Sequence, residues 1–325
     1  MNEYINNWFT IIEQMSNDNT YKLAWGRAVI ECIQFDKYSI NDEDKVVVEF
    51  EEIAKCMLKY YWNQLFFFNL KQSPYTNKEP VICTDVKKLI DEYIKITGST
   101  IPVWYDEAFK VIIKNNVKLY KQVLQHVVRT LHENVCHRFM NVPGKVLEVY
   151  EYHDKYDSRI YFHVDDIVVL KEYSIILSKL LNYKWAQLLE KFNYAPNIIN
   201  KVNGISENKL RRSSLTKYRD ILLSQYENGK VLDFYTGDEL KDDEISVDHV
   251  IPWSFMYSDD IWNLVLTSRS HNSSKSNSIP SVEIINKLKE RNEKLLSVLD
   301  GKYRDEIELS IQNGYVDKFY FDCKL

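Results

Sequence analysis

A chain of 325 residues with 45% hydrophobic and 27% charged side chains is typical of a globular protein with a sizeable buried core. It contains only 8 glycines and 7 prolines, which favours long helices over many short strands joined by tight turns. The net charge of −5 excludes an evenly basic nucleic-acid-binding surface, although it leaves room for a local basic patch.

The cysteines and the apolar runs indicate the compartment in which the chain works. The five cysteines are odd in number and form no CxxC pair, which predicts reduced thiols rather than a disulfide framework. The N-terminus has no basic start, so we expect no signal peptide. The most apolar run, Tyr60 to Leu70, is interrupted by polar residues and is too short to cross a bilayer. We therefore expect a cytoplasmic protein with no membrane segment.

Helical spacing of apolar residues dominates the first 140 residues. It covers residues 2–16, 20–35, 50–68, 86–94, 104–115 and 117–140. We expect Asn19 or Thr20 to cap the second of these helices and Thr84 to cap the fourth. Residues 45–50 alternate between apolar and polar positions and predict a short strand.

The next segment predicts a hairpin, a long helix and a linker. Residues 146–150 and 159–163 are β-prone, so we expect them to pair with each other. Asp165 or Asp166 can cap a helix that runs to Phe192. Residues 196–206 have the composition of a linker. We therefore expect a mainly helical domain over residues 1–205, which would select the substrate or a partner, and a second domain over residues 206–325.

Charge changes sign after the predicted linker. Basic residues gather first on a short helical stretch, at Lys209, Arg211, Arg212, Lys217 and Arg219. Such a cluster is often only a solvated helix face, but here it is also a candidate contact for a DNA backbone. The segment from Asp233 to Asp260 is acidic, and an acidic segment approaches phosphate only with help from a cation or from basic neighbours.

Within this acidic segment the sequence predicts a strand, a loop, a second strand and a helix. Residues 245–249 form the first β-prone run, which Pro252 ends. Residues 263–267 form the second run. Ser268 or Ser270 can cap a short helix over residues 271–276.

The polar residues in this layout suit one metal centre. Asp248 and His249 are neighbours on a strand and point to opposite faces, so they can serve one centre only where the strand ends. Asn272 supplies an amide oxygen from the following helix, and Lys275 lies one turn further along the same face. A carboxylate oxygen and an amide oxygen suit Mg²⁺ or Mn²⁺ better than zinc.

The same segment also carries a longer pattern. Its residues are Asp248-His249, Pro252, Ser254-Phe255, Asn263, Val265-Leu266-Thr267, Asn272, Lys275 and Ser276 to Pro280. In this pattern the stretch from Val231 to Pro280 resembles the ββα-metal motif of HNH endonucleases, and it is particularly similar to the HNH domain of RNA-guided CRISPR effector nucleases. A looser likeness to stand-alone bacterial HNH proteins rests on Asn19 to Lys22, Trp185 to Asn193 and Pro252 to Ser254. The resemblance implies a mainly α chain: a helical N-terminal region with a small hairpin, then the HNH module, then C-terminal helices.

The resemblance also implies roles for single residues. Asp248 and Asn272 would bind the metal, and His249 would be the general base that takes a proton from the attacking water. Asn263 would hold His249 in its orientation, and Lys275 would contact phosphate. His271 is an alternative metal ligand to Asn272, because some family members use a histidine as the last ligand.

Many stand-alone HNH proteins bind a structural zinc ion through two CxxC pairs around this motif. Here the matching positions hold Asp233 with Thr236, and Ser268 with His271. That set is too poor in soft ligands for a structural zinc site, so we expect none. Aromatic packing around Phe234, Tyr235, Trp253, Phe255 and Trp262 would hold the module together instead.

Two other groups of residues have competing interpretations. The group His126, His132, Cys136 and His137 is helix surface or core, with a second zinc site as the alternative. The aromatic run Tyr60, Tyr61, Trp62, Phe66, Phe67 and Phe68 is core, with a base-stacking platform as the alternative.

By this resemblance we expect an endonuclease that hydrolyses DNA phosphodiester bonds in restriction or anti-phage defence. Because one such centre cuts one strand, double-strand cleavage would need a homodimer, a partner nuclease or two visits. One alternative is an effector subunit of a multi-protein defence complex, silent until its partner assembles with it. The other is an RNA-cleaving nuclease of the same chemistry.

Overall fold

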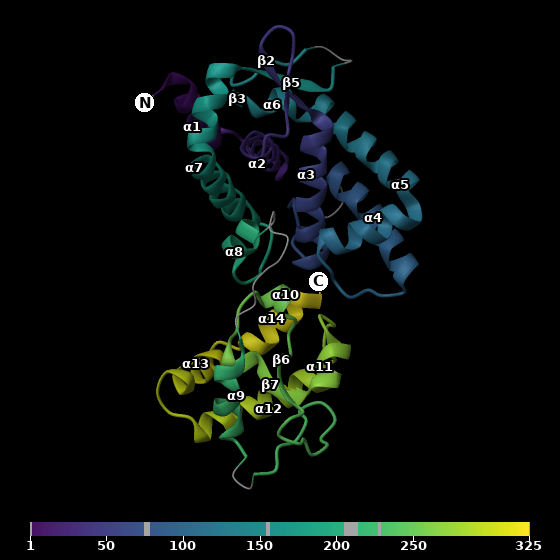
Figure 1. Cartoon of the computed structure of the whole chain (residues 1–325). Coiled ribbons are helices and arrows are strands. Elements are labelled where there is room, and N and C mark those ends of the chain that lie inside the picture. Colours follow the sequence, from purple (N-terminus) through teal and green to yellow (C-terminus); the bar gives the residue numbers. More distant parts are fainter. Residues whose placement is uncertain (1, 75–78, 154–156, 205–213, 227–228, 325) are drawn as a thin grey trace. The chain divides into compact units, whose positions relative to one another are not determined.

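The computed structural model describes residues 2–74, 79–153, 157–204, 214–226 and 229–324. The chain divides into two compact units (Figure 1). Unit 1 comprises Met1–Asn193 and Ile198–Asn208, and unit 2 comprises Tyr194–Asn197 and Lys209–Leu325. Most described residues are helical and the sheets are small, which confirms the predicted mainly α class with helices after the HNH-like segment.

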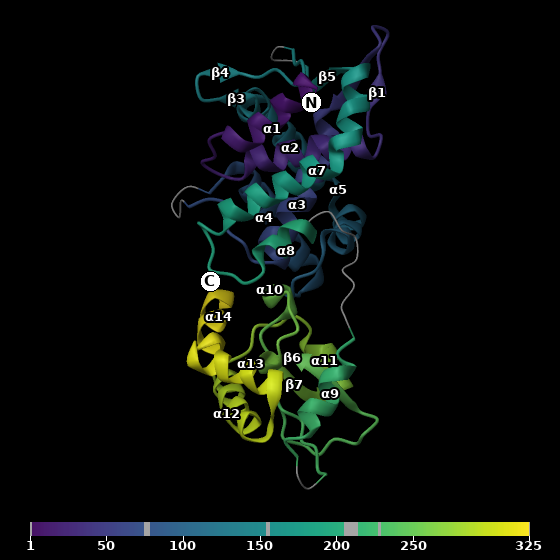
Figure 2. The same cartoon turned by 90° about the vertical axis from the view of Figure 1, so that its left-hand side faces the viewer.

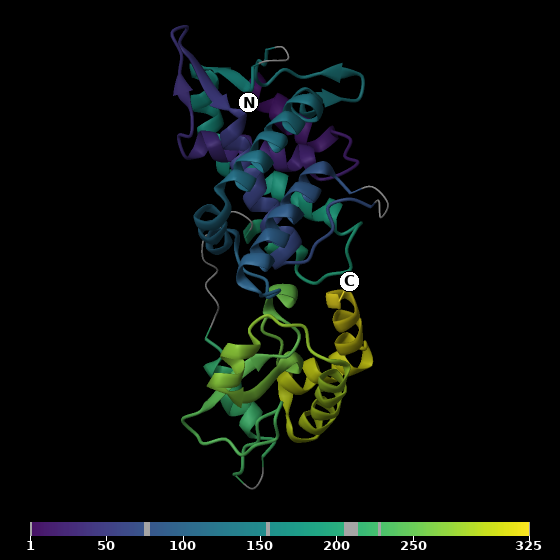
Figure 3. The same ribbon diagram turned by 90° about the vertical axis from the view of Figure 1, so that its right-hand side faces the viewer.

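Unit 1 is a bundle of helices around an aromatic core. Its helices are α1 (Glu3–Gln14), α2 (Tyr21–Gln34), α3 (Phe50–Trp62), α4 (Val81–Thr97), α5 (Tyr105–Asn134), α6 (Cys136–Phe139), α7 (Val164–Leu189) and α8 (Ile198–Asn203). Helix α2 lies between α7 and α3 and is buried along nearly its whole length (Figure 1). Helices α4 and α5 pack on each other on the side of the unit that Figure 3 faces.

The core of unit 1 explains two features of the sequence. The aromatic run that begins at the end of α3 is core as expected at five of its six positions, since Tyr60, Tyr61, Trp62, Phe67 and Phe68 are buried and only Phe66 is half-buried. Gly26 in α2 is the point of closest helix packing: a Cβ atom there would lie 2.7 Å from the ring of Phe139. A larger residue at this position would push α2 away from α6.

Helix boundaries in unit 1 follow the predicted spacing, with local corrections. Asn116 has a non-helical backbone (φ −147°, ψ 59°) inside α5, where the sequence predicts a break between residues 115 and 117. The expected cap at Thr84 is wrong, because α4 begins at Val81 after Pro80. Asp165 and Asp166 are not caps either, and lie in the first turn of α7 after His163. There they still favour the helix, because carboxylates interact well with its N-terminal dipole.

The predicted hairpin between residues 146–150 and 159–163 is wrong in its main pairing. Strand β5 (Arg159–His163) pairs antiparallel along its whole length with β2 (Lys45–Glu49), and β1 (Ser39–Ile40) completes the sheet. Glu151, the residue just after the predicted partner strand, forms an isolated bridge with Tyr161. Strands β3 (Asn141–Val142) and β4 (Lys145–Val146) instead form a small hairpin around Pro143 and Gly144. Local sequence identified the β-prone runs but not their partners, since a partner more than 100 residues away leaves no local signal.

The predicted linker contains structure. Residues 198–203 form α8, which packs on α7 and buries Ile198 and Val202. The neighbouring residues 194–197 belong to unit 2.

Unit 2 is built around the hairpin of β6 (Ile245–His249) and β7 (Leu264–Ser268). Its helices are α9 (Thr216–Leu223), α10 (Trp253–Met256), α11 (Arg269–Lys275), α12 (Val282–Val298), α13 (Gly301–Gln312) and α14 (Tyr315–Lys324). The predicted strand, loop, strand and helix are all present, and Ser268 caps α11 by accepting a hydrogen bond from the His271 N–H (3.1 Å). The loop adds α10 and a 3₁₀ turn at Ile261–Asn263. Figure 2 shows the three C-terminal helices beside the hairpin.

Candidate active site

Asp248 and His249 are the last two residues of β6, where the strand gives way to a tight loop. Asn263 closes this loop with its amide. Its Oδ1 accepts from the Ile251 N–H (2.8 Å) and its Nδ2 donates to the Ile251 carbonyl (2.9 Å). Asn263 thus fixes the backbone two residues after His249, and its role in orienting the His249 side chain stays a prediction.

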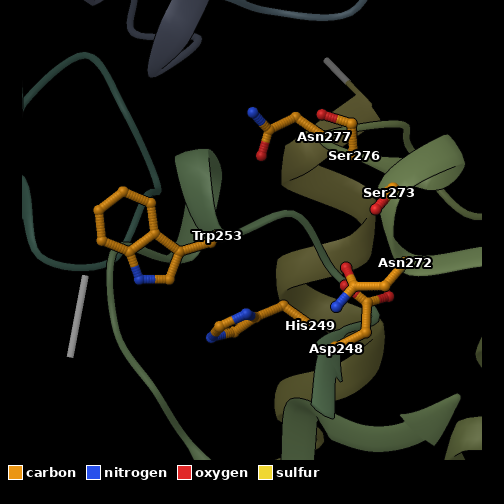
Figure 4. Close-up of a pocket in the computed structure, with 7 residues that line it drawn as sticks. All are labelled: Asp248, His249, Trp253, Asn272, Ser273, Ser276 and Asn277. Atoms are coloured by element: carbon orange, nitrogen blue, oxygen red, sulfur yellow. The ribbon is translucent and has the colours of Figure 1, made fainter. Parts of the chain in front are cut away.

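The end of β6 opens into a pocket of about 270 Å³. Seven residues line it: Asp248, His249, Trp253, Asn272, Ser273, Ser276 and Asn277 (Figure 4). Although neighbours on a strand point apart, the strand end allows both Asp248 and His249 to line this one pocket. Helix α11 brings Asn272 beside Asp248, as Figure 4 shows. The structure thus gathers in one place the three residues that the sequence singles out.

One oxygen of the Asp248 carboxylate is held by two neighbours. Its Oδ2 accepts a hydrogen bond from the Tyr235 hydroxyl (2.6 Å) and lies 3.1 Å from the Lys275 ammonium. Among the contacts of the described residues, no hydrogen bond or ion pair engages Oδ1. Burial, followed by the neighbouring Asp248 carboxylate, raises the pKa of Tyr235, so the phenol stays protonated and donates. The carboxylate is therefore fixed in rotation with one oxygen available for a ligand.

Hydrogen bonds settle the orientation of the Asn272 amide. Its Nδ2 donates to the Ser246 hydroxyl (2.9 Å) and to the Val247 carbonyl (3.2 Å). Because a carbonyl cannot donate, the nitrogen must face the strand, and the amide oxygen is left for another partner. A carboxylate oxygen from Asp248 and an amide oxygen from Asn272 form a donor set that fits a hard divalent cation. Among the described residues no group of three or more His, Cys, Asp and Glu side chains could hold a metal ion.

His249 is buried and its ring is tethered. The Nε2 atom lies 2.9 Å from Oδ1 of Asp259, in the loop between the two strands. A proton on Nε2 would be shared with this carboxylate, which leaves Nδ1 as the atom that can accept a proton. Sequence reasoning counted Asp259 only as part of an acidic segment. Asp259 is ten residues from His249 along the chain, across a loop, and no sequence pattern predicts this contact.

Lys275 is buried between backbone and side chains of the site. Its ammonium donates to the His249 carbonyl (2.6 Å), pairs with Asp248 and lies 5.8 Å from the Tyr235 ring centre. In this structure the lysine ties α11 to the end of β6, and its contact with phosphate stays a prediction. His271, the alternative ligand, stacks on Tyr235 (4.5 Å between ring centres) and does not line the pocket.

Asp233 occupies one of the positions at which zinc-binding relatives carry a cysteine. Its Oδ1 accepts from the N–H groups of Tyr235 (2.8 Å) and Thr236 (3.3 Å). Its Oδ2 accepts from the Thr267 hydroxyl (2.9 Å) and the Ser268 N–H (2.8 Å). Burial would raise the pKa of Asp233, but these hydrogen bonds outweigh burial and hold it below its usual value. One carboxylate thus joins the two segments that a zinc ion would join.

The predicted basic cluster is only partly described. Lys209, Arg211 and Arg212 lie outside the described residues. In α9, Arg219 pairs with Asp242 (2.6 Å), and the Lys217 ammonium lies 4.7 Å from the Tyr218 ring centre. These two cations are engaged within unit 2.

The other candidate metal group does not assemble. His126 contacts the buried Asp85 (2.6 Å), while the Cys136 thiol donates to the His132 carbonyl (3.4 Å).

No described helix is long and apolar enough to cross a membrane.

Comparison with known proteins agrees with this geometry. Residues 233–281 match the family model described as HNH endonuclease. Residues 233–281, in unit 2, are therefore an HNH endonuclease domain. A second model, described as Domain of unknown function (DUF8808), matches residues 2–201, which is more than half of the chain. The chain therefore belongs to the DUF8808 family.

Two curated HNH relatives are CRISPR-associated endonucleases. The chain is 38% identical over 118 residues to Cas9 of Streptococcus mutans serotype c. The matched segment covers 35% of this chain and 9% of that protein. It is 41% identical over 78 residues to Cas9 of Listeria innocua serovar 6a. This matched segment covers 23% of this chain and 6% of that protein. The chain thus matches less than a tenth of the length of either relative. No solved structure matches the chain.

Proposed function

We propose that this HNH protein is a metal-dependent endonuclease that hydrolyses phosphodiester bonds in DNA. The observation that carries the proposal is the shared pocket of Asp248, His249 and Asn272 at the end of β6. A carboxylate and an oriented amide for a cation, with a buried imidazole beside them, are what metal-assisted hydrolysis requires.

In this proposal Oδ1 of Asp248 and the amide oxygen of Asn272 would hold Mg²⁺ or Mn²⁺. The bound ion would supply positive charge against a phosphate oxygen and the departing 3′ oxygen. Tyr235 and Lys275 keep Asp248 in the orientation that binds the ion, through their contacts to Oδ2. The hydrogen bonds from Asn272 to β6 keep its amide oxygen from rotating away.

His249 acts as the general base. Its Nδ1 takes the proton from the attacking water, and the resulting charge on the ring is stabilised by Asp259 at Nε2. Lys275 contributes by holding the His249 carbonyl, so the backbone on which the imidazole sits does not move during the proton transfer. Asn263 contributes through the loop that follows.

Residues 1–205 act as the region that selects substrate or partner, and residues 206–325 act as the nuclease domain. The chain works in the cytoplasm, in restriction or anti-phage defence. Support for the defence role is the similarity of the nuclease domain to two CRISPR-associated endonucleases. An activating partner protein and an RNA substrate are the alternatives that the experiment must separate.

The test is a cleavage panel with supercoiled plasmid, linear duplex DNA, single-stranded DNA and single-stranded RNA, each with Mg²⁺, Mn²⁺ or EDTA. We expect nicking of plasmid with either metal and none with EDTA. His249→Ala should lower kcat by a factor of about 10²–10⁴, the usual contribution of a general base, and Asp248→Ala and Asn272→Ala should also lose activity. Asp243→Ala, at an exposed acid of the same unit, is the control. Equal persistence of plasmid with wild type and His249→Ala under every metal would overturn the proposal, and preferential RNA cleavage would change the substrate.

A further inference from the structure

Helix α7 carries an apolar face that unit 1 leaves uncovered. One side of the helix faces the core and buries Leu170, Leu177, Leu181 and Trp185 completely. The opposite side exposes large apolar side chains too: Val168 is 64% exposed, Ile175 58%, Ile176 54% and Tyr183 51%. Figure 2 shows α7 running across the near face of unit 1. A helix that is apolar on both sides normally has both sides covered.

The exposed face has an internal symmetry. Its centre lies between Ile175 and Ile176. Val168 lies seven residues before Ile175, and Tyr183 lies seven residues after Ile176. Glu172 lies three residues before Ile175 and Lys179 lies three residues after Ile176, and both are exposed. A helix with the same face and the opposite direction would therefore set apolar against apolar and acid against base.

We propose that this face of α7 is the contact surface of a homodimer in which two copies of α7 pack antiparallel across a two-fold axis. Around the axis, Ile175 of one copy meets Ile176 of the other, and Val168 meets Tyr183. Glu172 meets Lys179 on both sides of the axis, so the pair forms twice. This is the self-complementarity that an isologous two-fold interface requires.

Charge at the centre of the face favours a second copy as the occupant. Neither Glu172 nor Lys179 makes an ion pair within the described part of the chain, so both are available to a partner. The spacing of four, three and four residues from Val168 through Glu172 and Ile175 to Lys179 is that of a helix-packing seam. From Val168 to Tyr183 the seam is about 22 Å long at the rise of an α-helix. Antiparallel packing also sets each helix dipole against the opposite end of the other.

The two flanks of α7 hold the helix in place without covering the seam. On one flank, α1 packs through Phe9 on Tyr173 (6.4 Å between ring centres) and through the ion pair of Glu13 with Lys184 (2.8 Å). On the other flank, Lys171 contacts Asp36 (2.5 Å).

The experiment is a charge swap, read out by light scattering of the full chain over a concentration range up to about 50 µM, where specific interfaces of ordinary size are populated. Wild type should have twice the mass of one 38.7 kDa chain. Glu172→Lys and Lys179→Glu each place like charges opposite one another twice, and should raise the dimer Kd by at least about tenfold. The double variant restores opposite charges and should return to within about threefold of wild type.

The control is Lys121→Glu, the same charge change at an exposed position of α5, which should leave the Kd unchanged. Ile175→Asp should give monomer at every concentration. Each variant lies at an exposed position, and circular dichroism checks that it folds. A monomeric wild type, a dimer that no α7 variant weakens, or a swap that fails to restore the dimer overturns the proposal. Because the nuclease assay is separate, failure of this dimer leaves the proposed cleavage chemistry untouched, and the reverse is also true.

Discussion

The two units of this protein use their buried residues in different ways. Unit 1 buries large apolar side chains contributed by long helices, with Trp8, Trp25, Trp62 and Trp185 all fully buried. Unit 2 has its own apolar core, but around the hairpin it also buries polar groups that bond to backbone. Asp233 and Asn263 are examples, with exposed fractions of 3% and 0%.

Apolar packing and buried hydrogen bonds have different effects on a folded structure. Apolar packing stabilises strongly but tolerates small shifts, since it has no direction. Hydrogen bonds to buried groups contribute less net free energy, but their geometry is narrow and their loss is costly. Unit 2 uses them where side chains must keep their angles, at the ends of β6 and β7. The following predictions test this contrast, from the largest expected effect to the smallest.

The largest effect on stability should come from the core of unit 1. Trp25 is fully buried, donates to the Tyr150 hydroxyl (2.9 Å) and packs edge-on against Phe50 (5.2 Å between ring centres). Trp25→Ala should lower the free energy of unfolding of unit 1 by about 3–5 kcal/mol, measured by urea denaturation. Phe35→Ala, at a 60% exposed aromatic just after α2, should change it by less than about 0.5 kcal/mol. A small effect of Trp25→Ala would contradict the claim that apolar packing strongly stabilises unit 1.

The next effect should come from the polar cross-link in unit 2. Asp233→Asn removes the charge that four donors share and should lower the free energy of unfolding by about 2–3 kcal/mol at pH 7. Asp238→Asn, at an exposed acid of the same loop, is the control.

The Asp233 effect should also depend on pH. Hydrogen bonds hold its pKa below the ordinary 3.8, so the folded state releases this proton more readily than the unfolded state. The stabilisation is therefore fully present above pH 3.8 and is lost as pH falls through the lower, folded value. The difference between wild type and Asp233→Asn should shrink below about pH 3.8. A difference that stayed constant with pH would mean that the carboxylate charge is not what the donors recognise.

A smaller effect, on rate rather than stability, should follow from untethering His249. Asp259→Ala should lower kcat for plasmid cleavage by about tenfold to a hundredfold, with KM unchanged, because the imidazole loses its orientation and its charge partner. Parallel changes in KM and in thermal unfolding would indicate a general structural role for Asp259 instead. Asp243→Ala serves again as the control.

The smallest effect should come from Tyr235. Tyr235→Phe removes one hydrogen bond to Asp248 and keeps the ring that stacks on His271, so activity should fall by about threefold to tenfold. The loss should be largest at low Mg²⁺, because the orientation of a metal ligand is what changes. Tyr226→Phe, which removes a hydrogen bond to the Leu232 carbonyl, is the matched control. A loss that does not vary with Mg²⁺ would argue against an effect on the ligand.

Much of the site was accessible from the sequence because its signals are local. The strand that ends at His249, the cap at Ser268 and the helix that carries Asn272 follow from alternation, a serine and a short helical run within about 30 residues. The contacts that orient the side chains were not accessible. Tyr235 and Asp259 reach Asp248 and His249 across loops whose paths depend on packing, and no periodicity encodes such a path.

The amino-acid sequence by itself determined the helical class of unit 1, the layout of the hairpin and helix in unit 2, and three of the residues that line the pocket, Asp248, His249 and Asn272. These properties depend on spacing along one element, which sequence records directly. Only the tertiary structure decided that β5 pairs with β2, that Asn263 bonds to the backbone of Ile251, and that Lys275 bonds to Asp248 and the His249 backbone. Each of these contacts joins segments whose approach is set by how the whole unit packs, and the free energy of that packing belongs to no single stretch of the chain.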